Sequence, residues 1–216
     1  TTILKEEDWA NAWKDHFPVH RIGSRVVVRP PWLPYTPTAD DVVVELDPGM
    51  AFGTGLHPST KLSILGLEEV ATPGMAVLDV GTGSGILAIA AVKLGANHVD
   101  AVDVEPVAVR AARENAARNG VAEQISVKLG SVGADAPFRC AYDVVLANII
   151  ARILIELADG LTAATKPDGA LILAGIIDNR EAAVEAAFRD RGFATCSRRQ
   201  EDDWVSLTLR RVSPPQ

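Results

Sequence analysis

Short apolar runs alternate with longer amphipathic segments along most of the chain. Runs at 42–46, 75–80, 99–104, 125–129, 144–148 and 170–174 predict strands, several of them buried on both faces of a sheet. Residues 59–70, 84–94, 106–119, 150–165 and 180–191 predict the intervening helices. Two consecutive apolar runs, 193–200 and 204–210, close the chain as a strand pair. This order predicts an α/β fold with a doubly wound, mostly parallel seven-stranded sheet and an antiparallel strand near one edge.

The first forty residues differ in character from the rest. They hold Trp9, Trp13 and Trp32, and they include a proline-rich stretch with prolines at positions 30, 31, 34 and 37. Residues 6–17 predict a short helix with Trp9 and Trp13 on one face, and residues 22–29 predict a strand. We therefore divide the chain into a Trp- and Pro-rich linker segment over 1–40 and one large α/β domain over 41–216.

The composition is that of a folded globular protein, with 216 residues, 48% hydrophobic and 23% charged. The net charge of −7 disfavours a nucleic-acid groove and suits a basic protein partner or a cationic ligand. Cys140 and Cys196 are far apart, so we expect two reduced thiols and no metal site. No apolar run reaches the roughly 18 residues that span a bilayer, and no signal peptide is recognisable. We expect a cytoplasmic protein without membrane contact.

A glycine-rich motif, Asp79-Val80-Gly81-Thr82-Gly83-Ser84-Gly85, lies at a predicted strand-to-helix junction. Glycine permits the backbone angles of such a turn and lets a ligand approach the main chain. A dinucleotide fingerprint would place its third glycine one residue later, where this chain has Ile86. The spacing favours a nucleoside with a neutral or cationic tail over a pyrophosphate. A turn that serves only packing is the alternative.

Two polar residues end neighbouring predicted strands. Asp103 can accept hydrogen bonds from both hydroxyls of a ribose. Its alternative role is to cap the next helix, which Glu105 fits better because it directly precedes a proline. Asn148 follows an apolar strand at the sheet edge where ligands bind in open α/β folds. Methyltransferases that act on planar amides or on the exocyclic nitrogens of bases resemble one another in an Asn-Pro-Pro-aromatic tetrad at this position. This chain has Ile149 and Ile150 after the asparagine, which disfavours those substrates.

A second glycine-rich segment, residues 47–60, precedes the helix predicted at 59–70. Its backbone N–H groups and hydroxyls can bind an anion such as a carboxylate. We interpret His57 in this segment as structural rather than catalytic, because no second His or Cys stands near it to form a metal site.

Taken together, the segment Asp-Pro-Gly-Met-Ala-Phe-Gly-Thr-Gly at 47–55, the run 81–94 and Asn148 resemble one particular family. This family comprises the ribosomal protein lysine methyltransferases that modify large-subunit ribosomal protein L-eleven. The similarity covers essentially the whole chain, from Trp9 through a turn at 174–177 to 201–204. It implies a Rossmann-like methyltransferase fold, with S-adenosyl-L-methionine as cofactor and S-adenosyl-L-homocysteine as product. Family members carry a substrate-recognition domain before the segment near Trp9, which we expect this chain to lack.

The resemblance also assigns roles to individual residues. Thr60 and Asn148 would lie near the methionine end of the cofactor, and Asp103 would bind its ribose. Asn148 is also the candidate for positioning the acceptor amine. No dedicated base is needed, because burial beside the sulfonium lowers the pKa of that amine. The full set implied to bind the cofactor is Phe52, Gly53, Thr54, Thr60, Asp79, Gly81, Gly83, Asp103 and Asn148, with Phe52 to Gly55 forming a flap over the cofactor.

We therefore expect an enzyme that methylates lysine side chains or the N-terminal amine of a protein, foremost ribosomal protein L-eleven. We expect it to act as a monomer and to bind no nucleic acid directly. Two alternatives stay open. One is a methyltransferase for another protein or a small molecule on the same scaffold, and the other is a non-catalytic cofactor-binding module.

Overall fold

The computed structural model describes residues 17–47, 55–133 and 141–212. The helix expected at 6–17 lies outside these ranges except for its last residue, as do Phe52, Gly53 and Thr54. Within the described ranges, no helix is both long and apolar enough to cross a membrane.

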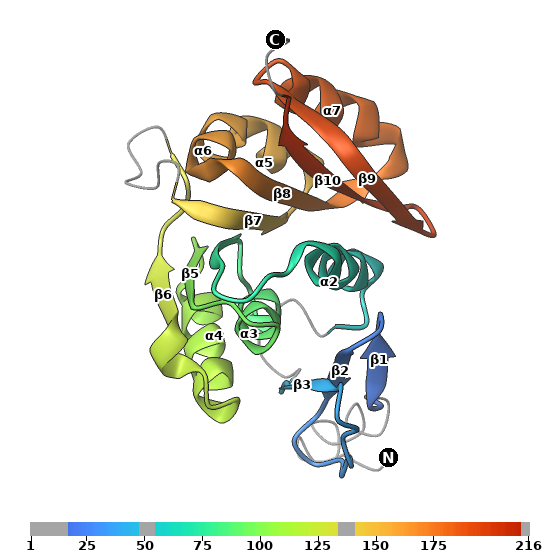
Figure 1. The fold of residues 1–216 in the computed structure, drawn as a ribbon, viewed down its shortest axis with the longest axis vertical. Helices are drawn as coiled ribbons and strands as arrows, with labels where there is room; N and C mark the ends of the chain where they lie inside the picture. Colours follow the sequence, from blue (N-terminus) through green and yellow to red (C-terminus); the bar gives the residue numbers. More distant parts are fainter. Residues whose placement is uncertain (1–16, 48–54, 134–140, 213–216) are drawn as a thin grey trace, which may run out of the picture.

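A seven-stranded sheet forms the centre of the fold, in the order β6-β5-β4-β7-β8-β10-β9 (Figure 1). Strand β10 is antiparallel to both of its neighbours, and the other strands run parallel to one another. The predicted mostly parallel sheet with an antiparallel strand near one edge is therefore confirmed. Its strands are β4 (Ala76–Val80), β5 (His98–Asp103), β6 (Ile125–Leu129), β7 (Tyr142–Asn148), β8 (Thr165–Ile177), β9 (Phe193–Glu201) and β10 (Trp204–Arg211).

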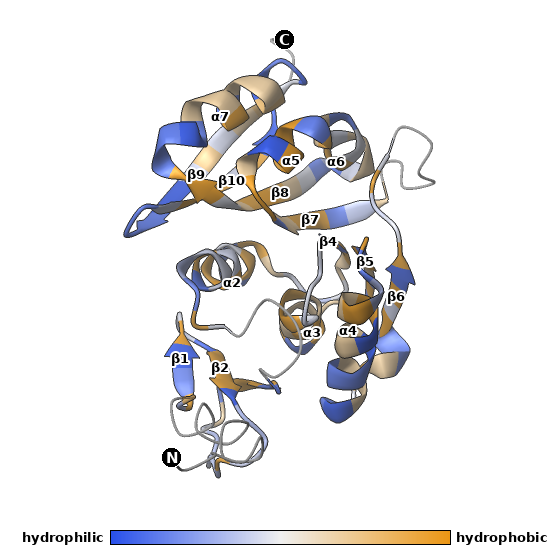
Figure 2. Cartoon of the chain, turned by 180° about the vertical axis from the view of Figure 1, so that it is seen from behind, coloured by the Kyte–Doolittle hydropathy of each residue, from blue (hydrophilic) through white to orange (hydrophobic). Residues whose placement is uncertain are grey.

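Helices cover both faces of this sheet and bury two separate apolar clusters (Figure 1). One face carries α2 (Pro58–Val70), α3 (Ile86–Lys93) and α4 (Pro106–Arg118), and the other carries α5 (Ala151–Glu156), α6 (Ala158–Ala164) and α7 (Glu181–Arg189). Short 3-10 turns stand at Ala122–Gln124 and Asp178–Arg180. Figure 2 shows α3 almost entirely in hydrophobic colours, whereas much of α4 is blue. Helix α3 is buried along seven of its eight residues, so it lies inside the molecule.

Three predicted elements differ from the structure. The single strand expected at 22–29 is a hairpin of β1 (His20–Ile22) and β2 (Val26–Arg29), because Gly23 adopts a φ of +68° and turns the chain. The helix expected at 150–165 is interrupted at Leu157, whose ψ of 3° separates α5 from α6. The segment 174–177, expected to be a turn, continues strand β8.

Strands β1 and β2 form a separate three-stranded sheet with β3 (Val42–Glu45), which runs parallel to β2. The predicted domain boundary at residue 40 falls between β2 and β3, so residues on both sides of it share this small sheet. The division into a linker segment and a domain stays a prediction.

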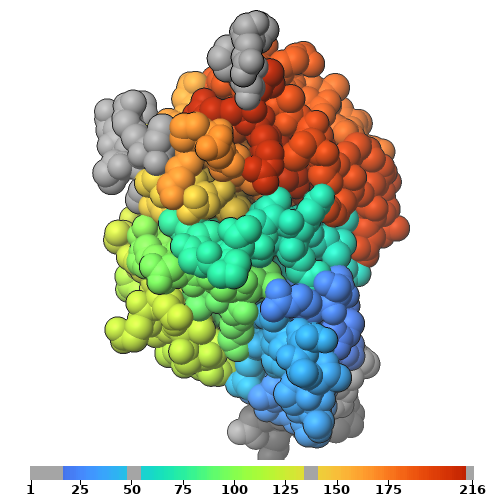
Figure 3. Space-filling view, viewed as in Figure 1, coloured from blue at the N-terminus to red at the C-terminus, as the bar shows by residue number. Residues whose placement is uncertain are grey.

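The small sheet is attached to the main domain through backbone groups. The carboxylate of Glu68, on α2, accepts hydrogen bonds from the N–H groups of Ser24, Arg25 and Val26 at 2.8 to 2.9 Å. Burial opposes the charge of Glu68, but these N–H groups outweigh it and hold its pKa below the ordinary value. Asn119, at the end of α4, bonds to both the N–H and the C=O of Glu45. Figure 3 shows the small sheet in contact with the segment that carries α2.

Candidate functional site

A cleft of about 820 Å³ opens at the carboxyl ends of the central strands. This is the edge at which open α/β sheets bind their ligands, and the volume suits a cofactor-sized molecule. Four residues predicted from the sequence line the cleft, namely Gly81, Gly83, Asp103 and Asn148. The first two follow β4, while Asp103 and Asn148 end β5 and β7. The structure therefore brings together residues that are up to 67 positions apart (148 − 81) in the sequence.

Two glycines of the turn after β4 stand where a side chain has little or no room. Gly81 has a φ of +73°, and a Cβ there would lie 2.5 Å from Cγ2 of Ile149. Gly85 begins α3 with a φ of +82°, and a Cβ there would lie 3.1 Å from Cα of Ala112 on α4. The first glycine lets the loop pass beneath the β7 connection, and the second lets two helices pack closely.

Both carboxylate oxygens of Asp103 accept backbone hydrogen bonds. Oδ2 accepts the N–H of Gly83 at 2.9 Å, and Oδ1 accepts the N–H of Glu105 at 3.0 Å. The carboxylate thus links the glycine loop to the β5–α4 connection, and each oxygen retains a second lone pair. Glu105 occupies the N-cap position of α4, but its side chain makes no capping hydrogen bond. The side-chain capping expected of Glu105 is therefore wrong.

Asn148 lines the cleft and contacts Thr60, which lies behind it and does not line the cleft. The amide Nδ2 of Asn148 donates to Oγ1 of Thr60 over 3.4 Å, and Thr60 is fully buried at the start of α2. The other amide atom, Oδ1, is buried and has no hydrogen-bond partner among the described residues. A buried acceptor without a donor is costly, so this atom points to a ligand that donates a hydrogen bond.

Asp79 lies beneath the glycine loop, fully buried, and does not line the cleft. Its Oδ2 accepts the hydroxyl of Thr82 at 2.6 Å, which ties the strand end to the loop. Burial raises the pKa of Asp79 to about 6, an effect that Thr82 and the amide of Ala88 partly offset and the charge of Asp103 increases. The structure therefore places Asp79 where it can support the loop rather than touch a ligand in the cleft.

Sequence analysis missed part of the cleft wall. Trp204 lines it from β10, and its ring stands edge-on to that of His57, which caps α2 by accepting the N–H of Ser59 at 3.2 Å. The cap agrees with the structural interpretation of His57. Trp204 could be found only through the fold, because strand pairing alone carries it from the end of the chain to this site.

The charged residues lining the cleft in the described part of the chain are all acidic. They are Asp103, Glu105 and Glu156, and no lysine or arginine accompanies them. No group of three or more His, Cys, Asp or Glu side chains within the described ranges could hold a metal ion. This lining favours a cationic ligand.

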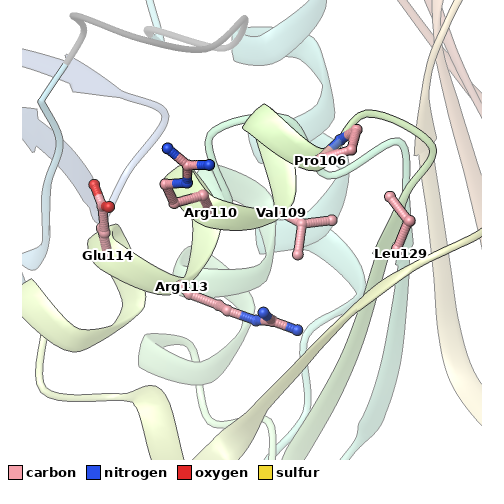
Figure 4. A pocket seen from close by; sticks show the side chains of 6 residues that line it. All are labelled: Pro106, Val109, Arg110, Arg113, Glu114 and Leu129. Carbon is pink, nitrogen blue, oxygen red and sulfur yellow. The ribbon is translucent and has the colours of Figure 1, made fainter.

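A smaller hollow of about 370 Å³ lies outside the cleft, beside α4 and β6 (Figure 4). The guanidinium groups of Arg110 and Arg113 point away from one another in Figure 4. Arg113 donates to the carbonyl of Val127 at 2.6 Å. Since its charged groups do not converge, this hollow lacks the polar arrangement of a binding site.

The sheet order, the glycine loop and the strand-end acid define a Rossmann-like methyltransferase. Within this class, the solved ribosomal protein L11 methylase of Lactobacillus delbrueckii subsp. bulgaricus superposes with a TM-score of 0.83 at 37% identity, over 89% of this chain and 98% of that one. The model of the family described as "Ribosomal protein L11 methyltransferase (PrmA)" matches residues 1–212. The chain belongs to this family of protein methyltransferases, as its resemblance predicted.

Two curated relatives illustrate the similarity. The protein named ribosomal protein L11 methyltransferase from Chloroflexus aurantiacus is 49% identical over 98% of this chain and 71% of its own length. The protein of the same name from Geobacter metallireducens is 50% identical over 95% of this chain and 67% of its own.

Proposed function

We propose that this chain transfers methyl groups from S-adenosyl-L-methionine to amino groups of ribosomal protein L11, on lysine side chains or at the N-terminus. The observation that carries the proposal is the buried Oδ1 of Asn148, which lacks a donor among the described residues. An amine supplies such a donor. The names of the relatives, which are ribosomal protein L11 methyltransferases, support this acceptor.

The residues present fit the proposed cofactor. Asp103 offers a carboxylate to ribose hydroxyls, and Gly81 and Gly83 permit close approach to the backbone. The acidic lining suits a molecule with a sulfonium and an ammonium group. When bound, S-adenosyl-L-methionine supplies a methyl group already activated for displacement.

The chain itself would contribute positioning and desolvation. Oδ1 of Asn148 accepts a hydrogen bond from the acceptor amine and directs its lone pair, while Thr60 fixes the amide through Nδ2. A free lysine amine is only about a thousandth neutral near pH 7.4. The apolar side chains of Ile149, Ile150 and Trp204 around the site disfavour its charged form and raise the neutral fraction.

Transfer of labelled methyl groups to purified ribosomal protein L11 tests the proposal. We expect Asn148→Ala to lower kcat by about 100-fold, because a misplaced nucleophile loses its near-attack geometry. The kcat is measured at saturating S-adenosyl-L-methionine, because Asn148 also belongs to the set implied to bind the cofactor. Wild-type protein that binds the cofactor product and transfers nothing to ribosomal protein L11 would contradict this acceptor.

The ligand class has its own test, which needs no acceptor. Thermal unfolding should shift upward with S-adenosyl-L-homocysteine and not with NAD, since Ile86 stands where a dinucleotide loop has glycine. Stabilisation by NAD alone would overturn the cofactor assignment.

We also propose that the enzyme acts as a cytoplasmic monomer without direct contact to nucleic acid. Light scattering tests the monomeric state, and titration with nucleic acid tests the absence of direct contact.

A further inference from the structure

Helix α5 presents an apolar stripe along the cleft. Ile153 within the helix and its two cap residues, Ile150 and Leu157, all line the cleft, and their spacing of three and four residues puts them on one side of α5. Ile150 is a large apolar side chain that is nevertheless 58% exposed, and it lies close to Asn148 in the lining of the cleft. The stripe therefore offers apolar surface to whatever enters the cleft.

A carboxylate stands beside the far end of this stripe. Glu156 lines the cleft with its side chain 53% exposed and forms an ion pair with Arg152 at 2.6 Å. Arg152 does not line the cleft. Exposed pairs of this kind are weak, so Glu156 can readily exchange Arg152 for a cation on a bound partner.

The geometry of the helix sets a distance between these features. Glu156 stands six positions after Ile150, which amounts to about 9 Å along the helix axis. Asn148, where the amine reacts under the proposed function, adjoins the Ile150 end. An extended peptide advances about 3.4 Å per residue, so a cation beside Glu156 belongs to a residue two or three positions from the acceptor.

The acidic side chains of the proposed cofactor region and of this surface come from different elements of the fold. Asp103 and Glu105 belong to β5 and its connection to α4, whereas Glu156 lies on a helix that covers the other face of the sheet. The described residues that line the cleft include no lysine or arginine, so no positive charge there repels a basic peptide.

We propose that this α5 face is the acceptor-binding surface. Ile150 packs against the aliphatic stem of the acceptor lysine, Ile153 and Leu157 line the path of the bound chain toward Glu156, and Glu156 binds a second cationic side chain two or three residues away in the same protein. The inference rests on the proposed function for the chemistry of the acceptor, and it adds the surface and the local sequence that are recognised.

Binding of two labelled peptides to the full chain loaded with S-adenosyl-L-homocysteine tests the surface without requiring catalysis. One peptide carries a lysine with a second lysine three positions away, and the other has glutamine at that second position. Anisotropy should report that Glu156→Gln weakens binding of the first peptide about fivefold and leaves the second unchanged, since a rim charge pair contributes modestly. Glu156→Lys should weaken the first peptide further, through repulsion.

Ile150→Ser should weaken both peptides by about fivefold, because it removes apolar contact to the lysine stem. Serine suits the N-cap position that Ile150 occupies, so the helix is preserved. Arg152→Gln breaks the same ion pair as Glu156→Gln but should not weaken either peptide. Val212→Ser removes a comparably exposed apolar side chain outside the cleft and should have no effect.

Equal responses of the two peptides to Glu156→Gln would overturn the charge assignment. An Ile150→Ser variant that binds like Val212→Ser would overturn the apolar one. Failure of the proposed function is a separate outcome, in which the wild type binds both peptides as described but methylates no ribosomal protein L11.

Discussion

The imidazole of His57 stands edge-on to the indole of Trp204, with ring centroids 4.6 Å apart and planes inclined by 71°. His57 caps the N-terminus of α2, and Trp204 begins β10, so the contact joins two elements that are distant in the sequence. Because α2 also carries Thr60, the ring pair fixes one wall of the cleft relative to the contact between Thr60 and Asn148.

Two substitutions separate the roles of His57. His57→Ala removes both the cap and the ring contact and should lower the free energy of unfolding by about 2 kcal/mol. His57→Asn retains a capping side chain and should lose only about half as much. Urea unfolding of the two variants makes the comparison. Equal losses would mean that the cap contributes nothing.

Cofactor affinity should depend on Asp103. Asp103→Ala removes a charge-assisted acceptor for the ribose and for the N–H of Gly83, so affinity for S-adenosyl-L-homocysteine should fall at least about tenfold. Asp103→Asn keeps one oxygen acceptor, so its affinity should lie between those of the wild type and of Asp103→Ala. Calorimetric titration gives both values, with Asp100→Asn as a control on the same strand outside the cleft. Unchanged affinity in a folded Asp103→Ala protein would remove Asp103 from the site.

The glycine loop allows steric clash to be separated from backbone strain. Gly81→Ala meets both a φ of +73° and Cγ2 of Ile149, whereas Gly120→Ala meets a similar φ of +70° and nothing within 4 Å. We expect Gly120→Ala to cost about 1 kcal/mol of stability and Gly81→Ala about twice that. Adding Ile149→Ala should restore part of the loss in Gly81→Ala. If the two glycine variants unfold alike, the contact with Ile149 is not limiting.

Stability should depend on pH through Asp79. Its pKa of about 6 in the folded protein lies above the ordinary value of 3.8, so its protonated form stabilises the fold below about pH 4 and this contribution is lost as the pH rises through 6. Asp79→Asn stays neutral and can still accept from Thr82. Between pH 4 and 7 the free energy of unfolding of Asp79→Asn, relative to that of the wild type, should therefore rise by up to roughly 3 kcal/mol. Urea unfolding at several pH values checks this, and a constant difference would refute it.

Local signals in the sequence predicted four residues that the structure brings to the lining of one cleft. Apolar runs that end in Asp103 and Asn148 identify buried parallel strands, and parallel strands bring their carboxyl ends to one edge. The glycine motif marks the same edge, because its backbone conformation excludes most side chains. Thr60 was included among the cofactor-binding residues because of the family resemblance alone, and in the structure its hydroxyl accepts a hydrogen bond from Asn148.

Other features depend on tertiary structure and have no local signal. The break at Leu157 involves no glycine or proline, so periodicity alone predicted one continuous helix. Asp79 was assigned to the ligand as part of the glycine-rich motif and by family resemblance, but it is fully buried beneath the glycine loop. The hairpin before residue 30 was missed because Gly23 is the only glycine in its short turn at 23–25, and the first strand, with the sequence His-Arg-Ile, has no apolar run to mark it.

Helix α2 serves two structures at its opposite ends. Glu68, in its last turn, binds the β1–β2 turn, and Thr60, in its first turn, contacts Asn148. Because one helix carries both contacts, we expect the small sheet and the contact between Thr60 and Asn148 to open together. In native-state hydrogen exchange, the amides of Ser24, Arg25 and Val26 should thus lose protection together with those in the first turns of α2, and a ligand that orders the cleft should slow exchange in a sheet it never touches.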